Sequence, residues 1–594
     1  MFEEVEEYLP ADLYAAESNR IESPGGATYY VSPNTGDDAA SGASDAEAWQ
    51  SFAAVNRMRL RAGDRVIVSP GDHHVTLKPD AIGTQGAPVN IDFKKGVHAF
   101  YADKAARLRY YISNAADNPK LPRPIGILLQ GCQHLKISGE EGSDLIFHDR
   151  MIYFVNDGCE NVSYQSVTFD MHRPTVSELL AVAVTPTAAV FKAASGSEFK
   201  IENGKFEWIG DLGEGWTMVQ EAVPGDGRCW RLGQWNPFKN TVATSEGAGT
   251  FRLEYRGEGT PRPTQGHQYQ FRRIVRDNVT ACNVRCRNVK FNNVRFYAMP
   301  GMGVVSQFTE NISFIKTHVE PRAAYGRTCP AWADCFHFSG CRGHVMIEGC
   351  RFSGTQDDPI NVHGTHLRLS AGTGPRSVRV QYMHGQTYGF EPFQKGDRVA
   401  FVSHRLLRPY FEAVVLRSQG VNEKEWLLEL DRPHAVFEAG DVVDNLTWYP
   451  ELMVKHCSIT MDSCRGILTT TRGKTVIENV EFQNTTMTAI EVADDANSWF
   501  ESGAVRDLTI RDCTFRHTGD PAINIHPETE SRDPALPVHS GIKIENCRFE
   551  SPGGIYARCV QGLTITGNHF AGGGQPIHTE ACTEVKLLNN KTGQ

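Results

Sequence analysis

Short runs in which apolar and polar residues alternate recur along the chain, and each of them ends in phenylalanine. Examples are GHVMIEGCRF ending at Phe352, VRDLTIRDCTF ending at Phe515 and GIKIENCRF ending at Phe549. Each run holds two short strands around an Asn, Asp or Cys turn, and from Phe482 onward the final phenylalanines lie 33, 34 and 21 residues apart. Strong helical periodicity is largely missing. The pattern predicts an all-β fold, a right-handed parallel β-helix in which each coil buries its inward Val, Ile and Phe against its neighbours.

The repeat is interrupted twice. Residues 176–275 hold strand-like runs such as AVAVTPTAAVF, and residues 366–452 hold RSVRVQYM, GDRVAFVS and EWLLELD. Both segments are typical of antiparallel β-structure with regular turns, so we predict two small β-barrel domains inserted between coils. The β-helix then divides into an N-terminal cap with the first coils (1–175), central coils (276–365) and C-terminal coils (453–594). Insertions often gather on the binding face, and we expect them to form the pocket rim or a contact in a homo-oligomer.

The start of the chain agrees with this architecture. TYYVSPNTGDDAASG (28–42) and AWQSFAAVNRMRLRAGDRVIVSPGDH (48–73) resemble the opening of pectate-lyase-like β-helices. There a strand, a helical cap and a Gly-Asp turn lead into the first coil. Such a cap covers the end of the hydrophobic column, as a solenoid requires.

Composition narrows the range of partners. The chain has 594 residues and a net charge of −10 without a basic run, which makes nucleic acid a poor partner. No apolar run is long enough to span a bilayer, and the acidic start MFEEVEEYLP lacks the layout of a signal peptide. The 15 cysteines occur singly, several in a repeated context such as I-E-x-C-x-F around Cys350 and Cys547. This predicts small buried residues rather than disulfides or zinc ligands, and we expect no metal and no cofactor.

Acidic residues gather at one point of the repeat. Asp357 and Asp358 precede the strand-like INVH, and Asp334 stands 24 residues before Asp358, ahead of FHFS. Residues one coil apart stack at the strand spacing of roughly 4.8 Å, so Asp334 and Asp358 are expected at the same corner of neighbouring coils. The alternation turns Phe336 and Phe338 inward. Three polar side chains should then face outward beside the acids: His337, Asn361 and His363.

Three carboxylates at one-coil spacing suit glycoside hydrolysis. One carboxylic acid protonates the leaving oxygen, while another carboxylate activates water or attacks. Crowding of like charges raises at least one pKa, which keeps an acid protonated near neutral pH. The spacing allows either inversion or retention. Turn chemistry alone also accounts for single Asp residues in a solenoid, and calcium-dependent lyases likewise cluster acids on a β-helix face.

Three long motifs resemble glycoside hydrolase family 110. They are ADCFHFSGCRGHVMIEGCRFSGTQDDPINVHGT (333–365), GILTTTRGKTVIENVEFQNTTMTAIEVADDANSWFESG (466–503) and MPGMGVVSQFTENISF (299–314). The resemblance implies a bacterial α-1,3-galactosidase that removes terminal galactose with inversion, on a β-helix with two barrel insertions. The implied substrates are the blood group B determinant and, in one subgroup, the linear Gal-α-1,3-Gal epitope. Because such mucin-type and blood group glycans lie outside cells, we expect a secreted or periplasmic enzyme whose signal peptide is absent from this sequence.

The same resemblance assigns roles to the acids. Asp334 matches the general acid, and Asp357 with Asp358 matches the pair that carries the general base. The family leads us to expect Gly after the acid, where this chain has Cys335; a small outward cysteine there would either fit the site or narrow it.

Further residues are candidates for the pocket. Trp499 could stack on galactose or simply pack a loop, and Arg465 could clamp hydroxyl groups or lie at a turn. Three acids are candidates for holding hydroxyl groups: Glu491, Asp494 and Glu501. Gln307, about one coil before Asp334, is a candidate for reaching the pocket.

Other functions compete with this interpretation. A polygalacturonase-like hydrolase of family 28 also sets three Asp on a β-helix, but needs basic residues that hold uronate carboxylates. A non-catalytic glycan-binding β-helix predicts an open aromatic-lined groove without a tight acid cluster. A polysaccharide lyase is expected to need a Lys or Arg base, usually with calcium, and would be sensitive to chelators.

Overall fold

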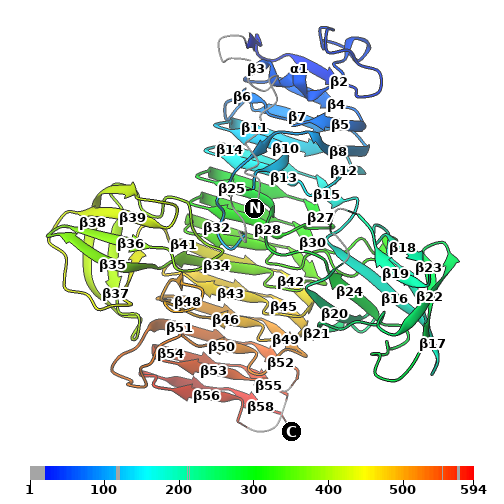
Figure 1. Ribbon diagram of the computed structural model, residues 1–594. Coiled ribbons are helices and arrows are strands. Elements are labelled where there is room, and N and C mark those ends of the chain that lie inside the picture. The colour runs from blue at the N-terminus through cyan, green and yellow to red at the C-terminus, as the bar shows by residue number, and fades with distance from the viewer. Residues whose placement is uncertain are drawn as a thin grey trace.

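The computed structural model describes residues 20–115, 121–210, 212, 215–551, 553–571 and 575–593. The first 19 residues of the predicted N-terminal segment lie outside this part of the chain. Three long sheets run along the molecule and form a parallel β-helix, as the repeats predict (Figure 1). Most strands pair in parallel with the strand one coil earlier and one coil later, so each coil contributes one strand to each sheet.

The second sheet carries the residues that matter most below. Its parallel strands follow each other from the N-terminal to the C-terminal coils: β10 (Arg123–Gln130), β13 (Ile152–Asp157), β25 (Val279–Val284), β28 (Met302–Gln307), β31 (Phe336–Ser339), β34 (Ile360–Thr365), β43 (Ile467–Thr470), β46 (Ile490–Val492), β50 (Ile523–Ile525), β53 (Ile555–Arg558) and β56 (Ile577–Glu580).

The phenylalanines that end the sequence repeats form a column in the third sheet. Phe482 on β45 (Glu481–Thr485) stands in register with Phe515 on β49 (Thr514–Arg516), and Phe549 and Phe570 follow. Their ring centroids are 5.1, 4.7 and 4.5 Å apart in that order. The predicted stacking of inward Phe residues is confirmed, and this column with the inward Val and Ile residues makes one continuous core.

Asparagines stand at the second position of neighbouring strands in the first sheet, β14 (Glu160–Gln165), β26 (Arg287–Asn292) and β29 (Glu310–Ile315). Asn161, Asn288 and Asn311 all adopt left-handed backbone angles, which Asn tolerates better than most residues. Their side-chain amides bond to each other along the helix axis, at 2.9 Å and 3.1 Å. The cysteines behave as predicted, since all 15 are free and 14 of them are buried.

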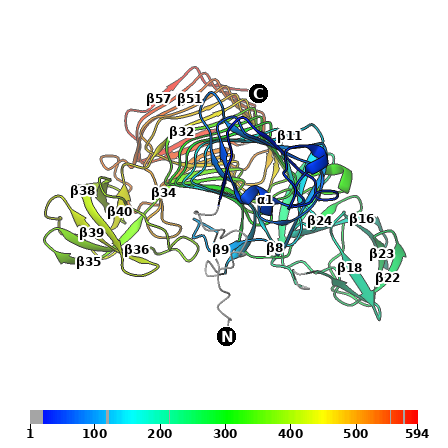
Figure 2. The ribbon, with the colours of Figure 1, turned by 90° about the horizontal axis from the view of Figure 1, so that it is seen from above.

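The N-terminal end of the column is capped. The strand β2 (Thr28–Val31) leads to a helix, α1 (Phe52–Asn56), whose five residues are all buried. Figure 2 looks along the β-helix and shows α1 at this end, with the two insertions projecting to either side. The helical cap is therefore present, although it is only five residues long.

Both insertions are antiparallel. The first is a seven-stranded sheet that runs from β16 (Val176–Val184) to β24 (Gln268–Arg272), with a separate hairpin of β18 (Phe199–Glu202) and β19 (Lys205–Trp208). The second is a closed barrel of six strands, which are β35 (Leu367–Gly374), β36 (Ser377–Gln381), β37 (Arg398–Val402), β38 (Pro409–Gly420), β39 (Glu425–Leu430) and β40 (Val442–Asn445). Each has a hydrophobic core of its own.

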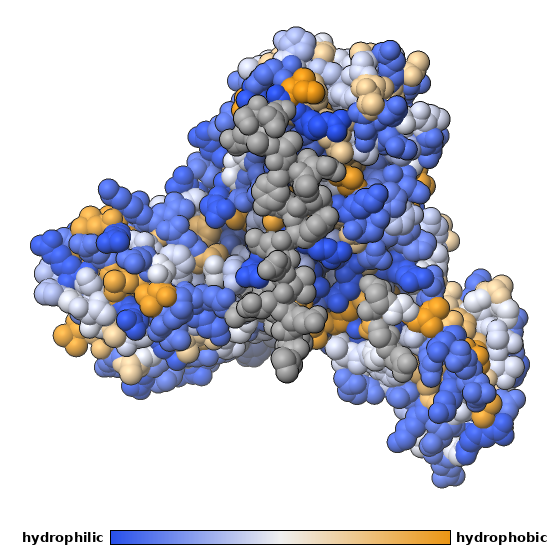
Figure 3. Space-filling view, turned by 45° about the horizontal axis from the view of Figure 1, so that its top comes forward, coloured by the Kyte–Doolittle hydropathy of each residue, from blue (hydrophilic) through white to orange (hydrophobic). Residues whose placement is uncertain are grey.

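The surface seen in Figure 3 is mostly hydrophilic, with apolar residues in small groups. Among the described residues, no helix is both long enough and apolar enough to cross a bilayer.

Candidate active site

The register of β31 and β34 is the one that the alternation predicts. Phe336 and Phe338 pair with Ile360 and Val362 and are fully buried in the core. His337 pairs with Asn361, and Ser339 pairs with His363, on the outward side of the same strands. The turn before each strand places Asp334 and Asp358 at the same corner of neighbouring coils, where the backbone NH of Cys335 donates to the Asp358 carbonyl.

Two arginines hold the three carboxylates together. Nη2 of Arg276 pairs with Asp357 Oδ2 and lies 3.6 Å from Asp334 Oδ1. Arg465 donates from Nε and Nη2 to the two oxygens of Asp358, at 3.0 and 2.8 Å. Asp334 and Asp358 are almost fully buried, and Asp357 is 9% exposed. Such bidentate, charge-assisted bonds fix the carboxylates in one geometry.

The surroundings of the acids push their pKa values apart. Burial alone would raise the pKa of Asp334, but the hydrogen bond from His337 and the charge of Arg276 hold it well below its usual range. Burial raises the pKa of Asp358 to about 7, against the charge of Arg465 and with help from the charges of Asp334 and Asp357. A raised pKa suits a general acid and a lowered pKa suits a general base, so these shifts run opposite to the roles that the family resemblance assigns to Asp334 and Asp358.

A chain of hydrogen bonds places a proton next to Asp334. The Gly364 carbonyl can only accept, so Nδ1 of His363 donates to it at 2.6 Å. Burial lowers the pKa of His363, so its ring is neutral and its Nε2 accepts from Nε2 of His337 at 2.9 Å. Nδ1 of His337 faces Asp334 Oδ2 at 2.8 Å, so one proton lies between these two side chains. Asp334 can draw on this proton as a general acid.

Glu501 and Trp499 come to the site on one loop. The strand β47 (Glu501–Ser502) pairs antiparallel with β34, and Glu501 accepts hydrogen bonds from Asn361 at 3.5 Å and from Asn114 at 2.9 Å. The ring of Trp499 is 42% exposed and lies 5.7 Å from the Arg276 guanidinium. Asp495 shapes this loop, because its carboxylate accepts from the backbone NH groups of residues 497 to 500.

Three other predicted residues lie outside the cluster. Gln307 accepts from the backbone NH of Ser113 at 2.9 Å, so it anchors the 111–113 segment. Asp494 is buried beside the backbone NH of Gly503, 3.3 Å away, and burial raises its pKa to about 6. Glu491 lies two strands beyond Asn361 on the outward side, and burial raises its pKa to about 7 although the charge of Arg465 opposes this.

Arg276, Asn114 and Thr387 complete the site but were missed in the sequence. Arg276 follows the last strand of the first insertion, and Thr387 belongs to the second insertion, where its hydroxyl donates to Asn114 Oδ1 at 2.6 Å. None of them lies in a strand that alternates toward the acids. Only the position of Arg276 could have indicated its role, since it stands where the first insertion returns to the β-helix.

Cys335 does not narrow the site. It is fully buried in the main core next to Phe336, because β31 begins one residue later and the turn rotates the cysteine inward. The expectation of an outward cysteine was wrong.

A neighbouring cysteine raises the question of a metal. Ligand atoms of Asp357, Asp358 and Cys464 lie within 4.8 Å of one another. Burial raises the pKa of the Cys464 thiol, and guanidinium groups already pair with both carboxylates. The donors therefore suit arginine pairing better than metal binding.

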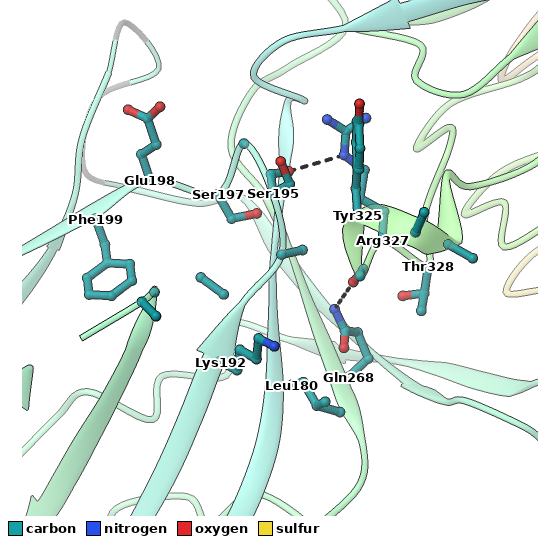
Figure 4. Close-up of a pocket in the computed structure, with 18 of the residues that line it drawn as sticks. Leu180, Lys192, Ser195, Ser197, Glu198, Phe199, Gln268, Tyr325, Arg327 and Thr328 are labelled. Atoms are coloured by element: carbon teal, nitrogen blue, oxygen red, sulfur yellow. Dashed lines mark hydrogen bonds between the residues drawn. The ribbon is translucent and has the colours of Figure 1, made fainter. Parts of the chain in front are cut away.

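A cavity of about 1280 Å³ lies elsewhere, between the first insertion and the segment that follows η4 (Ala323–Tyr325) (Figure 4). Its described lining contains one carboxylate, Glu198, which pairs with Arg173 at 2.6 Å. Arg327 donates to the Ser195 carbonyl and Gln268 to the Gly326 carbonyl across its wall. These contacts attach the first insertion to the segment that follows η4. Because the cavity has no pair of acids in its described lining, it does not offer acid–base chemistry.

Comparisons with known proteins identify relatives of this chain. A family model described as GLAA-B beta-barrel domain II matches residues 377–443, within the second insertion. Alpha-1,3-galactosidase A of Akkermansia muciniphila is 34% identical over 97% of each chain. In Bacteroides thetaiotaomicron, alpha-1,3-galactosidase A is 34% identical (82% of this chain, 87% of that one) and alpha-1,3-galactosidase B is 30% identical (84% and 85%).

A solved structure, the family 28 exopolygalacturonase of Yersinia enterocolitica, aligns with 96% of this chain and 79% of its own. Its TM-score is 0.41 at 10% identity, a likeness too low to favour any function. The relatives in sequence decide the family: the chain belongs to the α-1,3-galactosidases A and B, a family of glycoside hydrolases.

Proposed function

We propose that this protein is an exo-acting, inverting α-1,3-galactosidase that releases terminal galactose from Gal-α-1,3-Gal glycans. The observation that carries the proposal is the cluster of Asp334, Asp357 and Asp358 in a chain whose relatives bear that name. Asp334 with the proton beside His337 serves as general acid, and the pair Asp357 and Asp358 supplies the general base.

Arg276 bridges Asp334 and Asp357, because its Nη2 pairs with Asp357 Oδ2 and lies 3.6 Å from Asp334 Oδ1. These two oxygens are therefore closer than the roughly 6.5–9.5 Å that inverting glycosidases need between their carboxyl groups. Inversion is proposed from the resemblance to the family, and the anomer that is released first tests it.

Several nearby groups suit a neutral galactosyl residue. Trp499, which is 42% exposed, offers an aromatic ring with the His384 ring packed 4.3 Å from it, and Glu501 offers a carboxylate for hydroxyl groups. Oδ1 of Asn361 is buried without a hydrogen-bond partner among the described residues, in direct neighbourhood of Asp334 and Glu501, to which the same amide donates. The arginines of the site are paired with Asp357 and Asp358, which leaves them poorly placed to hold the uronate of a family 28 substrate.

The proposed substrates are the blood group B antigen and the linear Gal-α-1,3-Gal epitope on mucin-type glycans. NMR of the reaction with the fucosylated B trisaccharide and with the linear disaccharide tests this. We expect β-galactose to appear first, which is the mark of inversion. Appearance of α-galactose first would exclude inversion, and release of no galactose from either glycan would exclude the substrate class.

The proposed location is the periplasm or the outside of the cell, where these glycans occur. The 15 free cysteines do not prevent this, since 14 of them are buried and the remaining one is half-buried, out of easy reach of oxidants.

Galactose release is expected to rise as the pH passes through about 7. The pKa of Asp358 is raised to about 7, and a general base acts only when it is ionised, so Asp358 becomes able to act as a base above this pH. A pH profile of kcat/KM measures this. The residual activity of Asp358→Asn should not rise with pH in this range. If this variant shows a rise as large as that of the wild type, the titrating group is a residue other than Asp358.

A further inference from the structure

One row of outward positions crosses the whole second sheet. Each residue is in register with the next, from the N-terminal to the C-terminal coils: Leu128, Val155, Cys282, Val305, His337, Asn361, Leu468, Glu491, Asn524, Tyr556 and His578. The row is apolar as far as Val305 and largely polar from His337 onward. The acid cluster lies at this change.

The apolar part of the row is covered. Ile112 and Ala115 pack with Val155, Cys282 and Val305 in one buried cluster. Beside it, Asn114 binds Glu501, and its backbone NH donates to the Thr387 hydroxyl at 3.2 Å. The site is therefore closed on the side of the N-terminal coils.

The polar part of the row is open. Glu491, Asn524 and Tyr556 are half-buried, and His578 is exposed. Asn524, Tyr556 and His578 line one cavity of about 390 Å³. Their strands β46, β50, β53 and β56 continue the sheet beyond β34 and β43 (Figure 1), at a spacing of roughly 4.8 Å per strand. We call Glu491, Asn524, Tyr556 and His578 the polar strip.

The polar strip is joined to the acid cluster. Arg465, which binds Asp358, also lies close enough to Glu491 for its charge to lower the pKa of that carboxyl. Asn524 donates to both oxygens of Glu491 at 3.0 Å. A chain of sugars that leaves the acid cluster toward the C-terminal coils would pass over these side chains.

We propose that the polar strip binds the sugars on the reducing side of the scissile bond, so that a neutral oligosaccharide of three or four sugars is the preferred substrate. This inference rests on the proposed galactosidase function. The strip combines an aromatic ring at Tyr556 with amide, imidazole and carboxylate groups, which together bind the apolar faces and hydroxyl groups of sugars.

The charges near the strip select against anionic sugars. Asp520 lines the same cavity, and Asn524, which also lines it, is bonded to the carboxylate of Glu491. The nearby Arg532 already pairs with Glu580 at 2.5 Å. Sialylated or sulfated sugars would therefore meet like charge.

Kinetics on two substrates test the proposal. The ratio of kcat/KM for a neutral α-1,3-galactosyl tetrasaccharide to that for an aryl α-galactoside should fall about tenfold in Asn524→Ala and in Tyr556→Ala. Lys543→Ala is the matched control, because Lys543 points outward on the same coils but from the first sheet. Its ratio should equal that of wild type.

Calorimetry separates this proposal from the catalytic one. The trisaccharide that lacks the terminal galactose should bind the wild-type protein. Its dissociation constant for the Tyr556→Ala variant should be about tenfold higher. If no substrate releases galactose but this binding pattern holds, the strip binds glycans and the galactosidase assignment fails. If the ratio and the binding are the same in wild type and both variants, the polar strip does not bind sugars.

Discussion

Replacing Asp334 with asparagine is expected to lower kcat/KM about a thousandfold for an α-1,3-galactosyl disaccharide, within the usual range for loss of a general acid. The loss should be far smaller for 4-nitrophenyl α-galactoside. A sugar leaving group needs the proton that lies between Asp334 and His337, whereas nitrophenolate leaves without one. Steady-state kinetics with both substrates measure the difference.

The Asp357→Asn variant, which removes a proposed base instead of the proposed acid, is compared with Asp334→Asn. This variant should lose about a thousandfold on both substrates, because activation of water does not depend on the leaving group. Azide, which needs no base, should restore turnover of the aryl galactoside and give β-galactosyl azide. Equal losses on both substrates in Asp334→Asn would remove the acid role from Asp334, even if the variant folds as the wild type does.

The alternation of inward and outward residues along the strands was enough to predict the central part of the outward row in the second sheet. Once Phe336 and Phe338 are assigned to the core, His337 must face outward, and the 24-residue offset sets Asn361 beside it. The carboxylates follow from the same reasoning, since a turn at equal positions of two coils brings Asp334 and Asp358 together. Local pattern is sufficient wherever neighbouring coils repeat each other.

Residues that reach the site from other parts of the chain could not be predicted in this way. Asn114 binds Glu501 across 387 positions of sequence, and Thr387 arrives on the second insertion. The docking of the insertions and the 111–114 segment depends on tertiary contacts that have no period. The loop of residues 494–502 shows the same limit, because Glu501 and Trp499 reach the site while Asp494 turns to the Gly503 backbone.

Arg276 is the most informative of the residues missed in the sequence, and Arg276→Met is expected to lower kcat/KM roughly a hundredfold. Its guanidinium is the charge partner of Asp357 and lies 3.6 Å from Asp334, with Trp499 beyond it. Without it, two buried carboxylates repel each other and lose their fixed positions. Breaking a buried ion pair also costs about 3–5 kcal/mol of stability.

The pH dependence of that loss distinguishes a charge effect from a packing effect. Arg276 helps to hold the pKa of Asp334 below its unfolded value, so it stabilises the fold above about pH 4. This contribution disappears as the pH falls and the carboxyl takes up a proton. The difference in Tm between wild type and Arg276→Met should therefore stay large from pH 7 to about pH 4 and shrink as the pH falls below about 4. Arg287→Met, which breaks only the exposed pair with Glu160, should differ little from wild type over the whole range. A Tm difference for Arg276→Met that stays constant over the whole range would show that Arg276 acts through packing, and the carboxylates would then need another source of their charge balance.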